Sequence, residues 1–146
     1  VSLAGTAVKG DSVILEQNKA LGGPMAAGLT MEQLYTLPAI KKTINENAWY
    51  RHFMEYDPQT DIRQIKCPVL ALNGSKDLQV IATQNLPALR RRLPRHERTL
   101  IKQYEGLNHL FQHCQTGMPS EYGQIEETIA EEVLKDIADW IQTNIK

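Results

Sequence analysis

Two loops in the sequence carry side chains suited to acid–base chemistry. The apolar run 69–72 is followed by Asp77, the β-prone run 99–104 is followed by His109, and a glycine lies between each run and its polar residue. A hydroxyl or thiol nucleophile needs an imidazole to accept its proton, and the imidazole needs a carboxylate to fix its tautomer. The order Asp then His therefore predicts the acid and base of a nucleophilic hydrolase, within hydrogen-bond reach of each other.

Each of these residues also has a simpler interpretation. Asp77 lies in a polar turn where its carboxylate can cap the following helix, and His109 can be an ordinary loop histidine. The chain order, the strand context and the separation together favour the catalytic interpretation. His52 and His113 are secondary candidates. Cys114 lies close to His109 and His113, which suggests a thiol nucleophile, but it follows the histidine in the same loop, which favours an ordinary loop residue.

The sequence contains no nucleophile elbow. No Gly-x-Ser-x-Gly motif occurs, and a strand–elbow–helix setting is absent around Ser2, Ser12, Ser75 and Ser120. The chain also begins at Val1 within a run that is typical of a buried strand. We therefore expect the C-terminal part of a larger enzyme, inactive by itself because it supplies the acid and the base without a nucleophile.

Apolar runs and helical patterns alternate along the chain, which predicts an α/β fold with about three parallel strands. Capping boxes are predicted at Thr30 and Thr128, a helix cap at Asp11 or Ser12, and a kink or a division at Pro38. The predicted strands cover residues 1–4, 69–72 and 99–104, and the predicted helices cover 12–21, 31–44, 81–93 and 129–145.

The segment 11–56 is a helical insertion between two predicted strands, and an insertion at this place can form a lid over the strand ends. It contains an aromatic stripe, for which we expect core packing rather than a substrate wall. The members of this stripe are Trp49, Tyr50, Phe53 and Tyr56.

Composition limits the classes of partner. The formal net charge is −1, and the one basic run, Arg90–Arg92, fits a solvated helix face, so no nucleic-acid partner is predicted.

The two cysteines, Cys67 and Cys114, share no metal-ligand spacing, and we expect no metal or cofactor. Cys67 precedes a buried strand and is predicted to be a small core residue. No segment resembles a membrane span or a signal peptide, but we expect the natural N-terminus to lie upstream of Val1, so the cellular compartment is not predicted.

The chain resembles the bacterial α/β-hydrolases of the esterase and serine-aminopeptidase-like kind. The resemblance is carried by residues 1–10, by 47–58, and by the loops of Asp77 and His109. It implies that 1–146 is the C-terminal part of one doubly wound α/β-hydrolase domain, with 11–56 as a lid-like insertion. It further implies that Asp77 is the triad acid, that His109 is the base, and that a serine upstream of Val1 attacks a small ester or acyl substrate. Peptides and thioesters are alternative substrates.

A non-catalytic α/β interaction module is the chief alternative, because an Asp and a His can follow two strands incidentally. A phosphate or nucleotide site is disfavoured because no P-loop or Gly-x-Gly-x-x-Gly motif occurs. If residues 1–4 form a strand that pairs on one side only, its free edge should make the isolated chain self-associate.

Overall fold

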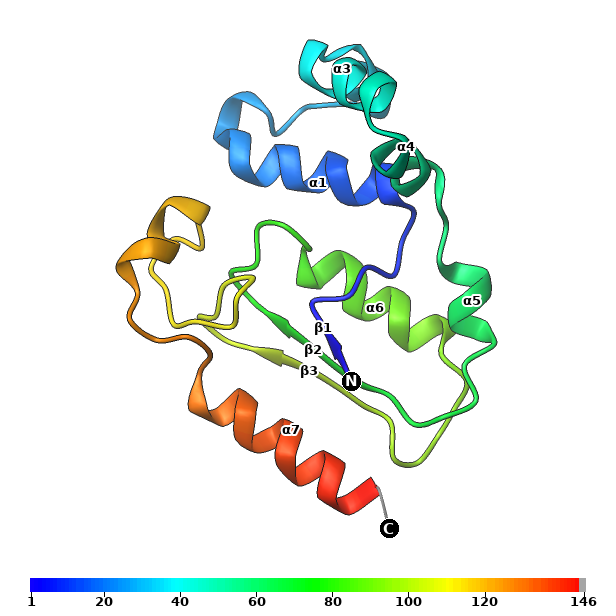
Figure 1. The fold of residues 1–146 in the computed structure, drawn as a ribbon, viewed down its shortest axis with the longest axis vertical. Coiled ribbons are helices and arrows are strands. Elements are labelled where there is room, and N and C mark those ends of the chain that lie inside the picture. The colour runs from blue at the N-terminus through cyan, green and yellow to red at the C-terminus, as the bar shows by residue number, and fades with distance from the viewer. Residues whose placement is uncertain (145–146) are drawn as a thin grey trace.

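The computed structural model describes residues 1–144 and contains a parallel three-stranded sheet. The strands are β1 (Ser2–Leu3), β2 (Leu70–Gly74) and β3 (Leu100–Tyr104), in the order β1-β2-β3. In the register, Ser2 faces Ala71 and Leu70 faces Leu100. This arrangement confirms the predicted α/β class and its three parallel strands (Figure 1).

The helices occupy both ends of the molecule and both faces of the sheet. In Figure 1, α1, α3 and α4 gather at one end, and α7 lies at the other. The α-helices are α1 (Gly10–Gly22), α2 (Met31–Thr36), α3 (Pro38–Glu46), α4 (Ala48–Glu55), α5 (Gln59–Arg63), α6 (Ala82–Arg92) and α7 (Glu131–Asn144). Two short 3₁₀ helices, η1 (Gly23–Met25) and η2 (Pro119–Gln124), lie in the connections. Within residues 1–144 no helix has the length and apolar character needed to cross a bilayer.

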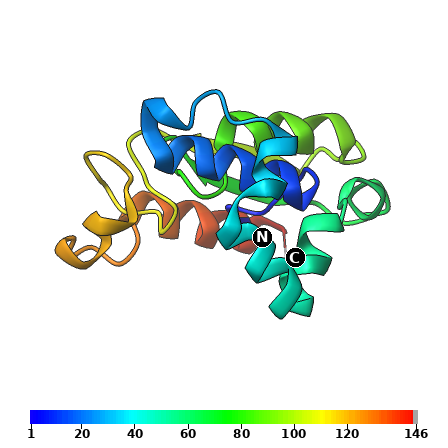
Figure 2. The same cartoon turned by 90° about the horizontal axis from the view of Figure 1, so that it is seen from above.

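Helices α6 and α7 cover opposite faces of the sheet (Figure 2). Ala71 of β2 packs in a cluster with Leu86 of α6, whereas Leu70 and Leu72 pack with Val133 of α7. Successive side chains of a strand point to opposite faces, so this division follows from the alternation along β2. Every residue of β2 is buried, as expected of a central strand that is covered on both sides.

Several predicted helix boundaries are confirmed. Thr30 forms the predicted capping box, accepting a hydrogen bond from Gln33 N while the Gln33 side chain accepts one from Thr30 N. Pro38 divides the predicted helix, because α2 ends at Thr36 and α3 begins at the proline. A proline fits the first turn of a helix, where no intrahelical donor is required.

The predicted cap of α1 at Asp11 or Ser12 is wrong. The helix begins at Gly10, and Lys9 occupies the N-cap position without a side-chain hydrogen bond. The Asp11 carboxylate instead accepts from Lys9 Nζ at 2.6 Å and from Tyr35 Oη at 3.2 Å. The Asp11 carboxylate therefore contacts other side chains and does not cap the N–H groups of α1.

The predicted capping box at Thr128 is also wrong, because α7 begins only at Glu131. Ala130 N donates to Phe111 O at 2.8 Å, and this contact holds the preceding segment against the loop that carries His109. Ile145, which was predicted to continue the apolar face of α7, lies outside the described residues. Cys67 is exposed rather than a core residue, since β2 begins three positions later at Leu70.

The segment from α1 to α4 has a hydrophobic cluster of its own, and it joins the core of the sheet through Val13 and Phe53. Gly10 lies where α1 and α4 approach, and a Cβ at this position would sit 1.7 Å from Phe53 O. Gly10 N also donates to Tyr56 O at 3.1 Å, so the segment enters and leaves the rest of the fold at one place. The buried members of the cluster are Ile14, Leu34, Ile40 and Met54.

Candidate active site

The loops that follow β2 and β3 are joined by backbone hydrogen bonds beyond the same edge of the sheet (Figure 1). Ser75 N donates to Tyr104 O at 2.8 Å, and Lys76 N donates to Leu107 O at 2.9 Å. The loops approach so closely that a Cβ on Gly74 would lie 2.2 Å from Leu107 O. A glycine at the end of β2 is therefore required for this contact, and the contact brings the two polar residues together.

Asp77 and His109 form a hydrogen-bonded pair. The distance from His109 Nδ1 to Asp77 Oδ2 is 2.9 Å, which confirms that the two side chains lie within hydrogen-bond reach. The Asp77 side chain is fully buried, whereas the His109 side chain is 28% exposed. A carboxylate only accepts, so this contact favours the tautomer with a proton on Nδ1 and leaves Nε2 as an acceptor. The catalytic role of the pair stays a prediction.

The second oxygen of the Asp77 carboxylate organises its own turn. Oδ1 accepts from Gln79 N and from Val80 N, each at 2.8 Å. The capping role considered for Asp77 from the sequence is therefore confirmed in part. Its carboxylate caps the turn that precedes α6, and α6 itself begins later, at Ala82. A single residue consequently holds a turn with one oxygen and contacts an imidazole with the other.

Asn73 is a contributor to the site that the sequence analysis missed. Its amide Nδ2 donates to Val80 O at 2.8 Å and lies 3.4 Å from Asp77 Oδ2. Asn73 is 1% exposed, and its Oδ1 has no hydrogen-bond partner among the described residues. One feature of the sequence could have pointed to Asn73. It is an asparagine at the end of an otherwise apolar run that predicts a buried strand, and a buried polar side chain needs hydrogen-bond partners.

A short loop at 108–112 fixes the backbone on either side of His109. Asn108 Oδ1 accepts from Leu110 N at 2.9 Å and from Gln112 N at 3.0 Å, and its Nδ2 donates to Gln112 Oε1 at 2.9 Å. Phe111 adopts a φ of 60°, a left-handed conformation that is rare for a bulky residue. The buried Asn108 and Gln112 thus stabilise a strained loop with the imidazole near its centre.

A cavity of about 310 Å³ lies beside His109. Its walls include Trp49 and Phe53 from α4 and Val13 from α1. The expectation that the aromatic stripe only packs the core is therefore incomplete: Phe53 does pack against buried residues, yet it also lines this cavity. Trp49 is 69% exposed and takes no part in the core.

The secondary histidines lie apart from the pair. His52 is exposed on α4 with its ring 5.7 Å from that of Tyr56. His113 is exposed and contacts two carboxylates, with Nδ1 at 3.0 Å from Glu127 and Nε2 at 3.3 Å from Glu132. Neither contact joins these imidazoles to Asp77.

Cys114 does not have the surroundings of an activated thiol. Its Sγ donates to Gly106 O at 3.3 Å rather than to an imidazole. Burial raises the pKa of the Cys114 thiol, and the ammonium group of Lys76 opposes this only in part. A raised pKa disfavours the thiolate, which is the nucleophilic form.

The serines present do not complete a triad. The Ser75 hydroxyl accepts from Gly106 N at 2.9 Å, and the Ser12 hydroxyl lies 3.3 Å from Asp11 Oδ1. In the described part of the chain, the hydrogen bond recorded for the His109 ring goes to Asp77. The 144 described residues therefore present an acid and a base without a hydroxyl at the free imidazole nitrogen.

Comparisons of the chain with protein-family models, with curated proteins and with solved structures find no match. The resemblance to α/β-hydrolases consequently rests on the residue pattern alone.

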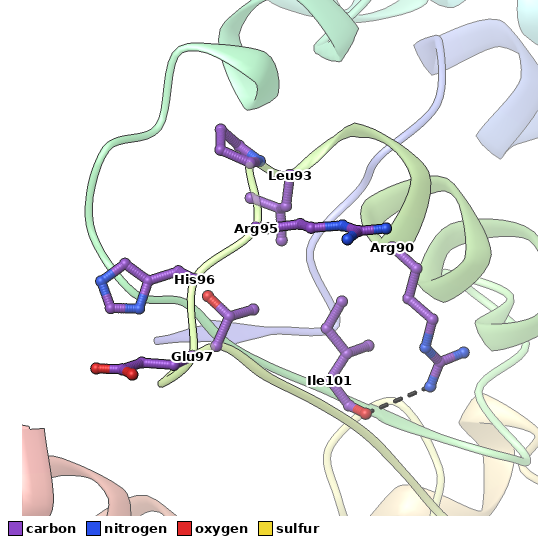
Figure 3. A pocket seen from close by; sticks show the side chains of 8 residues that line it. Arg90, Leu93, Arg95, His96, Glu97 and Ile101 are labelled. Carbon is purple, nitrogen blue, oxygen red and sulfur yellow. Dashed lines mark hydrogen bonds between the residues drawn. The ribbon is translucent and has the colours of Figure 1, made fainter.

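A second cavity, of about 410 Å³, lies away from the pair (Figure 3). It lies between the end of α6 and the start of β3, where Arg90 Nη2 donates to Ile101 O at 3.3 Å. Arg95, His96 and Glu97 lie around it with mixed charge. Neither Asp77 nor His109 lines it, and in residues 1–144 no cluster of three or more His, Cys, Asp or Glu side chains could hold a metal ion.

Proposed function

We propose that this chain carries the acid and the base of a serine hydrolase that cleaves small esters or related acyl compounds. The observation that supports the proposal is the 2.9 Å contact between the buried Asp77 carboxylate and the partly exposed His109 imidazole, placed beyond two adjacent parallel strands. Ligands of open α/β sheets bind at that edge. In this proposal the fold is that of an α/β-hydrolase, and the nucleophile is a serine that these 146 residues do not include.

The reaction would use the two nitrogens of His109 differently. Nε2 accepts the proton of the serine hydroxyl while the serine oxygen attacks the acyl carbon, and Asp77 stabilises the imidazolium that forms. His109 then donates this proton to the departing alcohol, leaving an acyl-enzyme. A water molecule attacks the acyl-enzyme by the same sequence, which releases the carboxylic acid and restores the serine.

The segment from α1 to α4 would act as a lid in this proposal. Residues of α1 and α4 share a cavity with His109, which is the place where a bound ester would meet the base. A lid at this position would exclude bulk water from the bound ester while still admitting the single water molecule that hydrolyses the acyl-enzyme. Peptides or thioesters would pass through the same steps, so the contact between Asp77 and His109 does not separate them from esters.

The non-catalytic interaction module is the alternative function, and it is favoured by the second role of Asp77, which is to cap its own turn. The hydrogen bonds from Gln79 N and Val80 N would be needed to hold the turn even in a protein without any activity. The partial exposure of His109 beside a cavity is what supports catalysis over this alternative.

The test begins with the coding sequence upstream of Val1 and the longer chain that it encodes. We expect a strand–elbow–helix motif with a serine there, and hydrolysis of p-nitrophenyl esters by the longer chain. In that chain His109→Gln should lower kcat/KM by roughly 100- to 10,000-fold, because general base assistance is lost. His96→Gln is the matched control and should retain activity, since His96 lies at the second cavity.

Two results would contradict the proposal. One is an upstream sequence without a nucleophile elbow, and the other is a His109→Gln enzyme with unchanged activity. Labelling of the 146-residue chain itself by a fluorophosphonate probe is a further check. Reaction of such a probe at Ser2, Ser12, Ser75 or Ser120 would show that the nucleophile lies inside the chain.

A further inference from the structure

Apart from the titratable His109, the cavity is lined by uncharged side chains. Apolar and aromatic residues of α1 and α4 form much of its wall, and Thr6, Gln17 and Gln79 add neutral polar groups. Burying a charge there would be unfavourable because no Lys, Arg, Asp or Glu side chain lines it. The cavity is therefore suited to an uncharged part of a ligand.

An aromatic surface borders this cavity and is largely exposed. The rings of Trp49 and Phe53 are stacked, with centroids 5.5 Å apart and an interplanar angle of 10°. Phe53 is half-buried, whereas Trp49 is 69% exposed, so most of the indole is open to solvent. A flat aromatic ring placed against it would bury apolar area and extend the stack.

The size of the cavity limits what it can hold. About 310 Å³ lies near the lower end of the range of small-molecule sites, roughly 300–1,000 Å³. An apolar cavity of about 150 Å³ is enough for benzene. A single ring together with the atoms of an ester group would therefore fit, whereas a long acyl chain would extend beyond it.

We propose that this cavity binds an uncharged aryl group of the substrate and so selects small aryl-bearing esters. The inference rests on the proposed function, because it treats His109 as the base that meets the ester. The ring would lie against Trp49, with the ester group next to the imidazole on the same cavity wall. The ring can belong to the acyl part or to the alcohol part of the ester.

The binding test uses the 146-residue chain, which is predicted to leave esters intact. Methyl phenylacetate carries the ring in its acyl part, and benzyl acetate carries it in its alcohol part. In ¹H–¹⁵N spectra, either ester should shift the Trp49 indole and the His109 resonances saturably. The indole of Trp140, the other tryptophan of the chain, lies on α7 and should not move. The arm with the larger saturable shift identifies the part of the ester that carries the ring.

Two analogues test the chemistry of the ring. Methyl cyclohexylacetate has similar bulk without a π face and should bind at least about 2-fold more weakly, because it gains no stacking. An analogue of methyl phenylacetate with a carboxylate on the ring should bind at least about 10-fold more weakly, since a charge would enter an uncharged cavity. Equal binding of the cyclohexyl and phenyl esters would overturn the proposal.

A pair of variants locates the site. Trp49→Ala should weaken binding of the aryl ester roughly 2- to 12-fold, the range that one aromatic contact supplies. Met25→Ala removes another exposed apolar side chain of the helical segment and should leave binding unchanged, because Met25 does not line this cavity. An unshifted Trp140 indole reports that each variant is folded. Unchanged affinity in Trp49→Ala would refute the aryl site.

Failure of this inference can be distinguished from failure of the proposed function. If hydrolysis by the longer chain depends on His109 but no aryl ester shifts Trp49, the aryl site is wrong and the hydrolase function stands. If aryl esters shift Trp49 but His109→Gln leaves hydrolysis unchanged, the aryl site stands and the function is wrong.

Discussion

At the scale of single residues, buried amides hold the loop that carries His109. Asn108 is 0% exposed and satisfies two backbone N–H groups of its own loop. Gln112 extends the network, since its Nε2 donates to Glu127 O at 2.8 Å. Buried polar groups of this kind are costly when a partner is removed. The position of the imidazole therefore depends on side chains that need not touch a substrate.

Replacing Asn108 should destabilise the protein more than replacing a neighbour. Asn108→Ala removes the acceptor of the Leu110 and Gln112 N–H groups and the donor to Gln112 Oε1, and we expect it to lower the free energy of unfolding by about 2–3 kcal/mol. Urea denaturation followed by circular dichroism measures the change. Gln115→Ala removes an exposed side chain nearby and should shift stability by less than about 0.5 kcal/mol. Equal effects of the two changes would show that the network is not a significant source of stability.

At the scale of elements, Asp136 joins α7 to β3. Its carboxylate accepts hydrogen bonds from Lys102 Nζ and from Tyr104 Oη, the latter at 2.6 Å. The bonds from Lys102 and then Tyr104 lower the pKa of Asp136. Burial, together with the bond to Asp136, raises the pKa of Tyr104. The helix is thus tied to the strand that precedes the His109 loop.

This link predicts a pH dependence of stability. A carboxyl group whose pKa is lower in the folded state than in the unfolded state stabilises the fold at pH values above the unfolded-state pKa, which is near 3.8 for Asp136. This contribution is lost as the pH falls through the folded-state pKa. Asp136→Asn should therefore lower the unfolding free energy by about 1 kcal/mol at pH 7 and by progressively less below pH ~4. Thermal unfolding between pH 2.5 and 7 measures the difference.

Asp139→Asn is the matched control, because Asp139 is more exposed and, within residues 1–144, forms its ion pair with the exposed Lys135. It should leave the unfolding midpoint nearly unchanged across the same range. If the difference in unfolding free energy between wild type and Asp136→Asn grows as the pH falls, the pKa of Asp136 is not lowered in the folded state.

The elements differ in how far the sequence predicts them. Strands β2 and β3 were predictable because a short apolar or β-prone run that is followed by a glycine is a local signal. The start of α7 was not, since Ala130 is held by a hydrogen bond to Phe111, a contact distant in sequence. The Asp77–His109 pair followed from chain order and strand context, whereas the cavity against Trp49 depends on how α1 and α4 lie beside the loop of His109.

At the scale of the whole molecule, both outer strands of the sheet, β1 and β3, pair on one side only within residues 1–144. Among the described residues β1 pairs only with β2, and Val1 and Leu3 are 59% and 46% exposed. An exposed strand edge with apolar side chains offers unpaired N–H and C=O groups to another chain. The 146-residue chain is therefore expected to self-associate.

Sedimentation velocity at increasing micromolar concentration measures this association. We expect the mean sedimentation coefficient to rise with concentration for the wild type, and Leu3→Lys to reduce the rise, because a charge at an edge opposes pairing. Leu134→Lys, at a position that is 50% exposed on α7, should not reduce it. A monomer at every concentration would contradict the expectation.

The helical segment from Gly10 to Tyr56 begins and ends at one backbone hydrogen bond and has its own hydrophobic cluster. Asp77 and His109 both lie outside it. A segment with these two properties can be exchanged as a unit, in evolution by recombination or in the laboratory by grafting, while the strands and the paired side chains stay in place. In the proposed hydrolase, new substrate preferences could then be acquired by replacing this one segment of 47 residues, independently of mutations in the loops that carry Asp77 and His109.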